Sequence, residues 1–252
     1  MIFFIIPAYN EAKNIPYLIG SISRKMNEMG LSYLLVAVND GSTDDTKEVL
    51  ESYSKRFPVV ILNHDTNKNV GQVFRTGFEY ALGRAKPEDV IVTKEADNTG
   101  DLGILPEMLK KIELGCDLVL ASCYAKGGKI IGTTIDRRLL SFFANTLLKI
   151  CFPMDGINTY SSFYRAYRAG SLKKAFEAYK GRLIEEPGFV CMVEMLIKLR
   201  RLPVKMEEVP MILRCSRRKG GSKMRKRQTM LAYLHLLFKE TGKHPKDLVW
   251  HG

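Results

Sequence analysis

The segment YLLVAVNDGSTDDT (residues 33–46) decides the fold class of this chain. It begins as an apolar run typical of a buried β-strand and ends as a polar, acid-rich turn typical of a helix start. A strand that is apolar throughout indicates a parallel sheet covered by helices on both faces. Ligands of such sheets bind beyond the carboxyl ends of the strands, so the polar turn marks a candidate functional site.

The sequence on either side repeats this alternation. Apolar runs predict further strands at residues 2–6, 59–62, 90–93 and 117–122, and helical spacing predicts helices at 14–29, 43–53, 72–82 and 105–114. This order predicts an α/β fold with a Rossmann-like, mostly parallel central sheet and helices on both faces. After about residue 125 the pattern predicts helices at 139–151, 190–199 and 227–240, and an edge strand at 205–213 that contains Pro210.

The composition is that of an ordinary globular protein. The chain has 252 residues, 46% of them hydrophobic and 26% charged, which is enough to bury a sizeable core. Its five cysteines are odd in number and form no C-x-x-C pair, which argues against a disulfide framework or a cysteine zinc site and favours a reducing compartment. No apolar run reaches the length of about 18 residues that a membrane span needs, and MIFFII at the start is too short for a signal peptide.

Positive charge is concentrated in one segment. The formal net charge is +12, and residues 214–227 (RCSRRKGGSKMRKR) contain eight Lys or Arg and no acid. Such a cluster suits phosphates, nucleic acid or an anionic membrane surface, with a solvated tail as the alternative. Because guanidinium groups chelate phosphate oxygens and glycine amides can cradle an anion, the interrupting Gly220 and Gly221 favour a phosphate.

Polar motifs follow the first and second predicted strands. Pro7 ends the first strand; behind it, Tyr9 offers a face on which a base can stack, and Glu11 offers an acceptor for ribose or base donors. After the second strand, Asp40 is placed to accept a hydrogen bond from a base N–H. A plain polar turn would also explain the first motif, and helix capping by Ser42, Thr43 or Asp44 would also explain the second.

An acid-x-acid triplet, Glu95-Ala96-Asp97, follows the fourth predicted strand. Two carboxylates at this spacing can reach one hard cation, and Mg²⁺ or Mn²⁺ commonly completes its shell with substrate phosphates. Such a triplet is common, so by itself it is weak evidence for a metal site. Its position after the two earlier motifs in the sequence makes it informative.

In this order the motifs resemble those of the family 2 glycosyltransferases, which have a nucleotide-sugar-binding GT-A fold. Residues 7–11 are similar to the family's first-strand motif, residues 39–46 to its D-D-G-S-x-D-x-T, and residues 95–97 to its D-x-D. Further segments resemble the branch that includes dolichol-phosphate mannose synthases and other polyprenyl-phosphate glycosyltransferases: residues 124–128, 137–145, 163–168 and 217–224. The resemblance covers about residues 1–225.

The resemblance implies a role for each matched residue. The residues that would bind the nucleotide sugar are Pro7, Tyr9, Glu11, Asp40, Gly71, Ala96 and Asp97. Glu95 and Asp97 would hold the Mg²⁺ or Mn²⁺ ion. The residues that would bind donor or acceptor phosphates are Arg138, Ser141, Arg165, Arg218 and Lys223, and the catalytic residues would be Asp97, Arg138 and Arg165. For Arg165 a structural ion pair is the alternative, and Glu194 is expected to be a buried charge paired with an arginine.

Three departures from the family pattern concern the metal and the acceptor. Glu95 is longer than the usual first acid of the D-x-D. Asn158 or Thr159 stands where an acid usually precedes the serine-aromatic-arginine stretch, and Asp155 is the nearest acid. Residues 98–101 lack the usual amide and paired prolines.

The resemblance implies an inverting hexosyltransferase that uses a GDP- or UDP-sugar and a polyprenyl or dolichyl phosphate acceptor. Such an acceptor is already an anion, so it needs positioning by cations rather than a general base. The alternative is a hydroxyl acceptor on a cell-surface polysaccharide or glycolipid, which would need a base such as Asp97 or Asp155. A nucleic-acid-binding module is disfavoured because no binding motif occurs and acids gather where a base and metal would lie. A further alternative is a catalytically inactive relative with the same fold, which would bind ligand without turnover.

The expected organisation is a catalytic domain over residues 1–225, with a nucleotide-sugar half (1–122) and an acceptor half (123–225), followed by an amphipathic helix and tail (226–252). Apolar side chains on one side of this helix are Met230, Leu231, Leu234, Leu237 and Phe238. The helix would either lie on an anionic membrane surface or pack on the domain. The expected location is cytoplasmic, at the periphery of a membrane.

Overall fold

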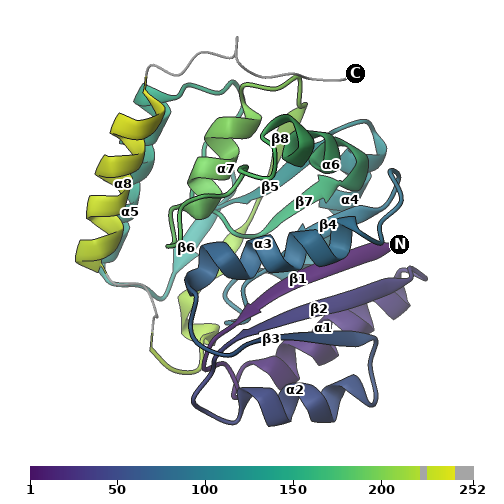
Figure 1. The fold of residues 1–252 in the computed structure, drawn as a ribbon. Coiled ribbons are helices and arrows are strands. Elements are labelled where there is room, and N and C mark those ends of the chain that lie inside the picture. Colours follow the sequence, from purple (N-terminus) through teal and green to yellow (C-terminus); the bar gives the residue numbers. More distant parts are fainter. Residues whose placement is uncertain (222–225, 242–252) are drawn as a thin grey trace.

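The computed structural model describes residues 1–221 and 226–241, and they are arranged around a seven-stranded sheet (Figure 1). The strands are β1 (Ile2–Ala8), β2 (Tyr33–Asp40), β3 (Val59–His64), β4 (Val90–Thr93), β5 (Leu118–Ser122), β6 (Lys129–Ile131), β7 (Arg165–Arg168), β8 (Met206–Pro210) and β9 (Ile212–Arg214). The α-helices are α1 (Ile15–Glu28), α2 (Thr46–Ser54), α3 (Asn69–Leu82), α4 (Leu105–Glu113), α5 (Ile135–Cys151), α6 (Ala169–Ala178), α7 (Cys191–Leu199) and α8 (Lys226–Glu240). Short 3₁₀ helices are η1 (Leu102–Ile104) and η2 (Cys215–Arg217).

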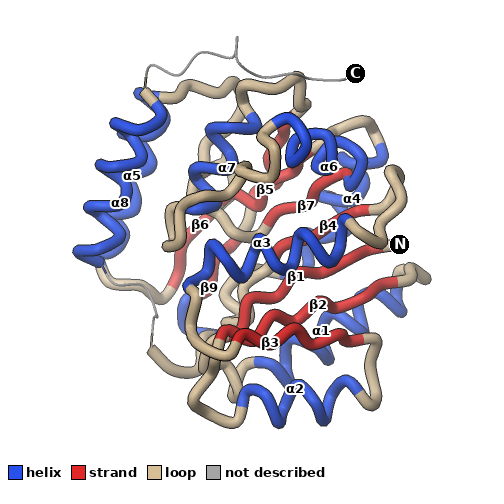
Figure 2. The backbone as a smooth tube through the Cα atoms, in the orientation of Figure 1, coloured by secondary structure: helices blue, strands red, loops and turns tan. Residues whose placement is uncertain are grey.

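The central sheet is mostly parallel and covered on both faces. Its strand order is β3-β2-β1-β4-β7-β5-β8, and β7 is antiparallel to both of its neighbours. Alternate side chains of β1 enter different cores: Phe3 and Ile5 pack toward α3, α6 and α7, whereas Phe4 and Ile6 pack toward α1, α2 and α4. Figure 2 shows helices on both sides of the strands. The predicted α/β fold class is therefore confirmed.

The topology brings the three polar motifs to one edge of the sheet. β1 lies between β2 and β4 and is parallel to both, with Ala8 opposite Asn39 and Ile5 opposite Thr93. The carboxyl ends of parallel strands meet at the same edge, so the segments that follow β1, β2 and β4 become neighbours. β5 also ends at this edge, because both β4 and β5 are antiparallel to β7.

The second half of the chain differs more from expectation. The strand predicted at 205–213 is two strands: β8 is an edge strand of the main sheet, as Pro210 predicted, and β9 pairs with β6 in a separate small sheet. β6, β7 and α6 were not predicted. Since β7 lies between β4 and β5, the two halves expected from the sequence share one sheet.

Helices α5 and α8 pack together at one side of the molecule, away from the central sheet (Figure 1). The described part of the chain contains no helix with the length and hydropathy of a membrane span. α8 confirms the helix predicted at residues 227–240.

Candidate active site

The first and second motifs are joined by hydrogen bonds through Asn10, which has a left-handed backbone conformation (φ 54°). The Asn10 backbone N–H donates to Ser42 Oγ (3.0 Å), and the Thr43 N–H donates to Asn10 Oδ1 (2.8 Å). The next N–H, that of Glu11, donates to Thr46 Oγ1 (2.8 Å). The capping alternative is not what the structure shows, because the N-cap of α2 is Asp45 and it has no side-chain capping bond. The hydroxyls of Ser42 and Thr46 instead fix the turn that carries Tyr9 and Glu11.

Asp40 lies at the end of β2 with 2% of its surface exposed. Its Oδ1 atom contacts His64 Nδ1 (2.7 Å) and accepts a hydrogen bond from the Lys68 N–H (2.9 Å). Both partners follow or end β3, the neighbouring strand. The proposed base acceptor is thus held rigidly by groups that the sequence motifs did not identify.

Asp97 is 7% exposed, and both of its carboxylate oxygens have partners. Oδ1 accepts hydrogen bonds from Thr99 N (3.0 Å) and Thr99 Oγ1 (2.7 Å). Oδ2 accepts from both Arg218 Nε (2.8 Å) and Arg218 Nη2. The third motif is therefore joined to the basic segment in a forked ion pair across 121 residues of sequence.

The basic segment also reaches the first motif, through Asn14. The Asn14 side chain donates from Nδ2 to Glu11 Oε2 (2.6 Å) and to the Lys219 carbonyl (2.9 Å). In return, the Lys219 N–H donates to Asn14 Oδ1 (3.0 Å). Asn14 was not predicted as a site residue, because its only signal is an amide next to a helix start.

Glu95 and Asp97 are the candidate metal ligands. Burial, together with the nearby charge of Asp97, raises the pKa of Glu95 above its ordinary value. In residues 1–221 and 226–241 no cluster of three or more His, Cys, Asp or Glu side chains is arranged to hold a metal. Two carboxylates nevertheless fit Mg²⁺ or Mn²⁺, because these ions commonly take one or two protein carboxylates and complete the shell with water and substrate phosphates. Arg218 competes with a cation for Asp97.

Lys94 lies beneath this acidic pair and was missed by the sequence analysis. It is 1% exposed, donates to the Gly100 carbonyl (2.8 Å) and lies over the ring of Tyr164 (4.6 Å to its centroid). Burial lowers the pKa of Lys94, and the charges of Glu95 and Asp97 oppose that shift. A buried lysine directly after β4 thus supports the loop that carries both carboxylates.

A pocket of about 340 Å³ opens at the start of α3, next to Asp40. The residues that line it are Lys68, Gly71, Gln72, Arg75, Glu185, Glu186 and Pro187. The Gly71 N–H donates to the Pro187 carbonyl (2.8 Å), and a Cβ atom at Gly71 would lie 2.1 Å from the Glu186 carbonyl oxygen. Gly71 is required by this close backbone approach, and it forms part of the pocket wall.

The expected phosphate-binding residues are not all brought together. Arg138 is exposed on α5, and Ser141 accepts a hydrogen bond from the Tyr124 hydroxyl (2.8 Å). Tyr124 follows β5, so it ties this part of α5 to the same sheet edge as the other motifs. Lys223 lies outside the described residues.

The surroundings of Arg165 differ from both expectations stated for it, a role in binding phosphate and a structural ion pair. Its side chain is fully buried, with an exposed fraction of 0%, so no phosphate can reach it in this structure. It forms no ion pair with a described carboxylate either; instead, Nε donates to the Ser162 carbonyl (2.7 Å) and Nη2 to the Tyr160 carbonyl (2.9 Å). These bonds hold the turn that leads into β7, so the assigned catalytic role does not fit.

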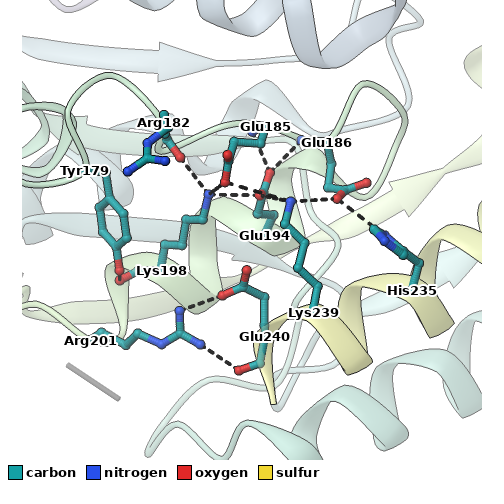
Figure 3. A network of polar contacts seen from close by, with 10 residues as sticks. All are labelled: Tyr179, Arg182, Glu185, Glu186, Glu194, Lys198, Arg201, His235, Lys239 and Glu240. Carbon is teal, nitrogen blue, oxygen red and sulfur yellow. Dashed lines mark hydrogen bonds and ion pairs between the residues drawn. The ribbon is translucent and has the colours of Figure 1, made fainter. Parts of the chain in front are cut away.

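Glu194 is a buried charge, as expected, but its partners are lysines rather than an arginine (Figure 3). Its Oε1 atom contacts Lys198 Nζ (2.9 Å) and Lys239 Nζ (3.2 Å). Its Oε2 atom accepts hydrogen bonds from the N–H groups of Glu185 (2.7 Å) and Glu186 (2.8 Å), which line the pocket. This network joins α7, α8 and the pocket wall.

Glu208 on β8 binds the segment in which Asn158 and Thr159 stand where the family usually has an acid. Its Oε1 atom accepts hydrogen bonds from Asn158 N (2.8 Å) and Thr159 N (2.6 Å), and Oε2 accepts from Asn158 Nδ2 (3.1 Å). Glu208 is far from residues 158 and 159 in the sequence, so sequence analysis could not predict that they are in contact. Asp155, the nearest acid in sequence, is exposed.

Comparisons with known proteins identify the family of this chain. Residues 3–176 match the model of glycosyl transferase family 2. A dolichol-phosphate mannosyltransferase from Pyrococcus furiosus is 31% identical over 93% of this chain and 62% of its own length, so the chain spans less than two thirds of that relative. An undecaprenyl-phosphate mannosyltransferase from Micrococcus luteus is 29% identical over 87% of this chain and 86% of its own.

Solved structures agree on the fold. Glucosyl-3-phosphoglycerate synthase from Mycobacterium tuberculosis, solved with Mn²⁺, UDP and glucosyl-3-phosphoglycerate, superposes with a TM-score of 0.65 at 17% identity, covering 96% of this chain and 80% of that one. At this identity the likeness concerns the fold alone. With the family model matching well over half of the chain, this protein belongs to glycosyl transferase family 2.

Proposed function

We propose that this protein transfers a hexose from a nucleotide sugar to a polyprenyl phosphate, with inversion and with a divalent metal ion. The observation that carries the proposal is the joining of Glu11, Asp97 and Arg218 at one sheet edge, through Asn14 and the forked ion pair. A base acceptor, a pair of carboxylates and a phosphate-seeking arginine are the parts that such a donor requires. Mannose is the first sugar to test, because the relatives are named for mannosyl transfer.

At the donor end, Tyr9, Glu11 and Asp40 hold the nucleoside, and Glu95 with Asp97 holds the metal. When bound, the divalent ion supplies charge neutralisation for the departing nucleoside diphosphate. With Asp97 engaged by the ion, Arg218 would be free to bind phosphate oxygens. No general base is needed on this account, because an acceptor phosphate is already ionised.

At the acceptor end, Arg138 and Ser141 on α5 bind the lipid phosphate beside the end of β5. The outer surfaces of α5 and α8 suit the apolar part of such an acceptor and the membrane that holds it. Large apolar side chains exposed there are Ile135 (75%), Leu139 (51%), Phe142 (53%), Phe143 (64%), Leu147 (41%), Ile150 (72%), Met230 (37%), Leu231 (67%), Leu234 (46%) and Phe238 (83%). We call these residues the α5/α8 apolar surface.

The orientation of α8 supports a membrane contact. Its inward side carries Thr229, Leu236 and Glu240, each at most 9% exposed. Of the apolar residues predicted from its spacing, Leu237 packs against the core, whereas Met230, Leu231, Leu234 and Phe238 are exposed. A helix in water normally buries its apolar side. The four apolar side chains that stay outside fit a helix that lies against lipid, with the basic segment before it drawn to anionic headgroups.

A transfer assay tests the proposal. Purified protein is mixed with Mn²⁺ or Mg²⁺, a panel of GDP- and UDP-sugars, and either a short polyprenyl phosphate or the matching polyprenol, and release of nucleoside diphosphate is measured. We expect release only with the lipid phosphate, and loss of release with EDTA. Release with the polyprenol or with a glycoside would support a hydroxyl acceptor instead. Nucleotide binding without release in any arm would indicate an inactive relative.

A further inference from the structure

His64 is a buried histidine that the proposed mechanism does not use. It ends β3, and only 9% of its surface is exposed. Its Nδ1 atom lies 2.7 Å from Asp40 Oδ1, and its Nε2 atom lies 3.0 Å from Thr76 Oγ1 on α3. The imidazole therefore bridges the predicted base acceptor and the helix beside the pocket.

The hydrogen bonds at Asp40 are divided unevenly between its two oxygens. Oδ1 receives both the His64 contact and the hydrogen bond from the Lys68 N–H (2.9 Å). The described residues provide no hydrogen bond to Oδ2. Two donors on one oxygen fix the rotation of the carboxylate, so the other oxygen is the one left for a ligand.

The proton positions follow from the partners. An ionised carboxylate can only accept, so Nδ1 of His64 carries a hydrogen in either charge state. In the neutral ring, Nε2 then accepts from the Thr76 hydroxyl, which selects the tautomer that Asp40 requires. Gln72, which lines the pocket, lies at the edge of hydrogen-bond distance from the same hydroxyl (3.5 Å).

We propose that His64 is a positioning residue for nucleobase recognition. It holds Asp40 Oδ1, with Thr76 orienting the ring, so that Oδ2 faces an N–H group of the donor's base. A base N–H is a feature of both uracil and guanine, and the inference does not depend on which one the donor carries. It rests on the proposed function, because it requires a nucleotide at Asp40.

A pair of near-matched variants separates the two contacts of the ring. The Asn side chain of His64→Asn can keep a donor near the Nδ1 position and hence near Asp40. The longer side chain of His64→Gln places its amide near the Nε2 position, where it can meet Thr76 but not Asp40. Thermal unfolding of each variant shows whether it is folded.

Binding of UDP and GDP in the presence of Mg²⁺ is measured by titration calorimetry on the full chain. We expect His64→Gln to weaken the better-binding nucleotide by about tenfold and His64→Asn to remain within about threefold of the wild type. Pyrophosphate, which has no base, should bind all three proteins equally. The KM for the nucleotide sugar should follow nucleotide binding, with kcat unchanged.

Several results would overturn the inference. Equal weakening in both variants, no weakening in either, or a parallel loss of pyrophosphate binding would show that His64 does not act through the base. If the His64 variants do not fold, Thr76→Val takes their place. It should weaken nucleotide but not pyrophosphate, and equal affinities would then count against the idea. Failure of the wild type to bind any nucleotide would contradict the proposed function as well, whereas nucleotide binding without sugar transfer would leave this inference standing.

Discussion

The nucleotide end and the α5/α8 end of this protein are built in opposite ways. At the nucleotide end, charged groups lie inside and are held in place by hydrogen bonds: Asp40 and Asp97 are 2% and 7% exposed. At the α5/α8 end, large apolar groups lie outside: Phe143 and Phe238 are 64% and 83% exposed. Each arrangement is costly for a free protein in water unless a ligand or a surface of matching chemistry compensates.

The contrast teaches how each end recognises its ligand. A small polar ligand such as a nucleotide requires groups that are fixed in advance. The hydrogen bonds that Asn10, Asn14 and Asp40 each make to neighbouring segments supply that rigidity. A lipid is fluid and has no fixed shape, so an exposed apolar area is enough. The two ends are therefore expected to respond to different substitutions, and the following experiments test that separation.

The largest effect is expected at the nucleotide end, from Asp97→Asn. It removes a metal ligand while keeping the size of the side chain, and turnover should fall by about a thousandfold. Vesicle binding should stay unchanged. Sugar transfer and flotation with anionic vesicles measure the two properties. Retained turnover would remove the metal role, and a loss of vesicle binding would show that the two ends are not independent.

The next effect is expected from the double variant Leu231→Ser with Phe238→Ser, on the outer side of α8. Loss of two large exposed apolar groups should weaken binding to anionic vesicles by about a hundredfold. Nucleotide affinity should not change. A matched control is Tyr17→Ser with Leu114→Ser, because these residues are also exposed (57% and 69%) but lie on α1 and just after α4. Equal loss in both double variants would rule out a specific membrane surface.

A smaller effect is expected on stability, from Lys239→Met on the inner side of α8. Burial opposes the charged form, but the bond to Glu186 and the charge of Glu194 raise the pKa of Lys239 above its ordinary value. Removing the cation leaves Glu186 and Glu194 with fewer partners, so the free energy of unfolding should fall by about 2 kcal/mol. Lys174→Met, at an exposed lysine of α6, should change it by less than about 0.5 kcal/mol.

The pH dependence of that difference follows from the raised pKa. A lysine whose pKa is raised on folding contributes its full stabilisation below the unfolded value, and the contribution is lost as the pH rises through the folded value. The gap between wild type and Lys239→Met should therefore be constant from pH 6 to about pH 9 and close only in strong alkali. Urea unfolding at several pH values measures it, and a gap that closed near neutral pH would point to a different cause.

The sequence predicted the fold and the meeting of the three motifs at one sheet edge, because the signals for both are local. Each strand is a short apolar run, each motif follows its strand directly, and parallel topology brings Glu11, Asp40 and Asp97 to one edge. Contacts between distant segments had no such signal. The pairing of Asp97 with Arg218 and the placing of Glu208 beside Thr159 depend on how loops return to the sheet.

The spacing of apolar residues in α8 predicted the helix but not its orientation. Periodicity showed that one side is apolar, but not which side faces the domain, because Lys239 and Glu240 carry their charges inward. For Arg165, too, the sequence did not reveal whether the side chain faces a ligand site or the interior. A family motif marked it for phosphate, yet two of its nitrogens donate to backbone carbonyls of Tyr160 and Ser162 inside the protein.

The inward charges of α8 have an evolutionary consequence. Arg201 and Glu194 hold the helix in place through Glu240 and Lys239, so the attachment does not depend on the outer side chains. Mutations at Leu231, Leu234 or Phe238 are then nearly free of folding cost. On the proposed function, descendants of this gene could adapt to new membrane compositions by changing one side of a single helix, while purifying selection would preserve the other side.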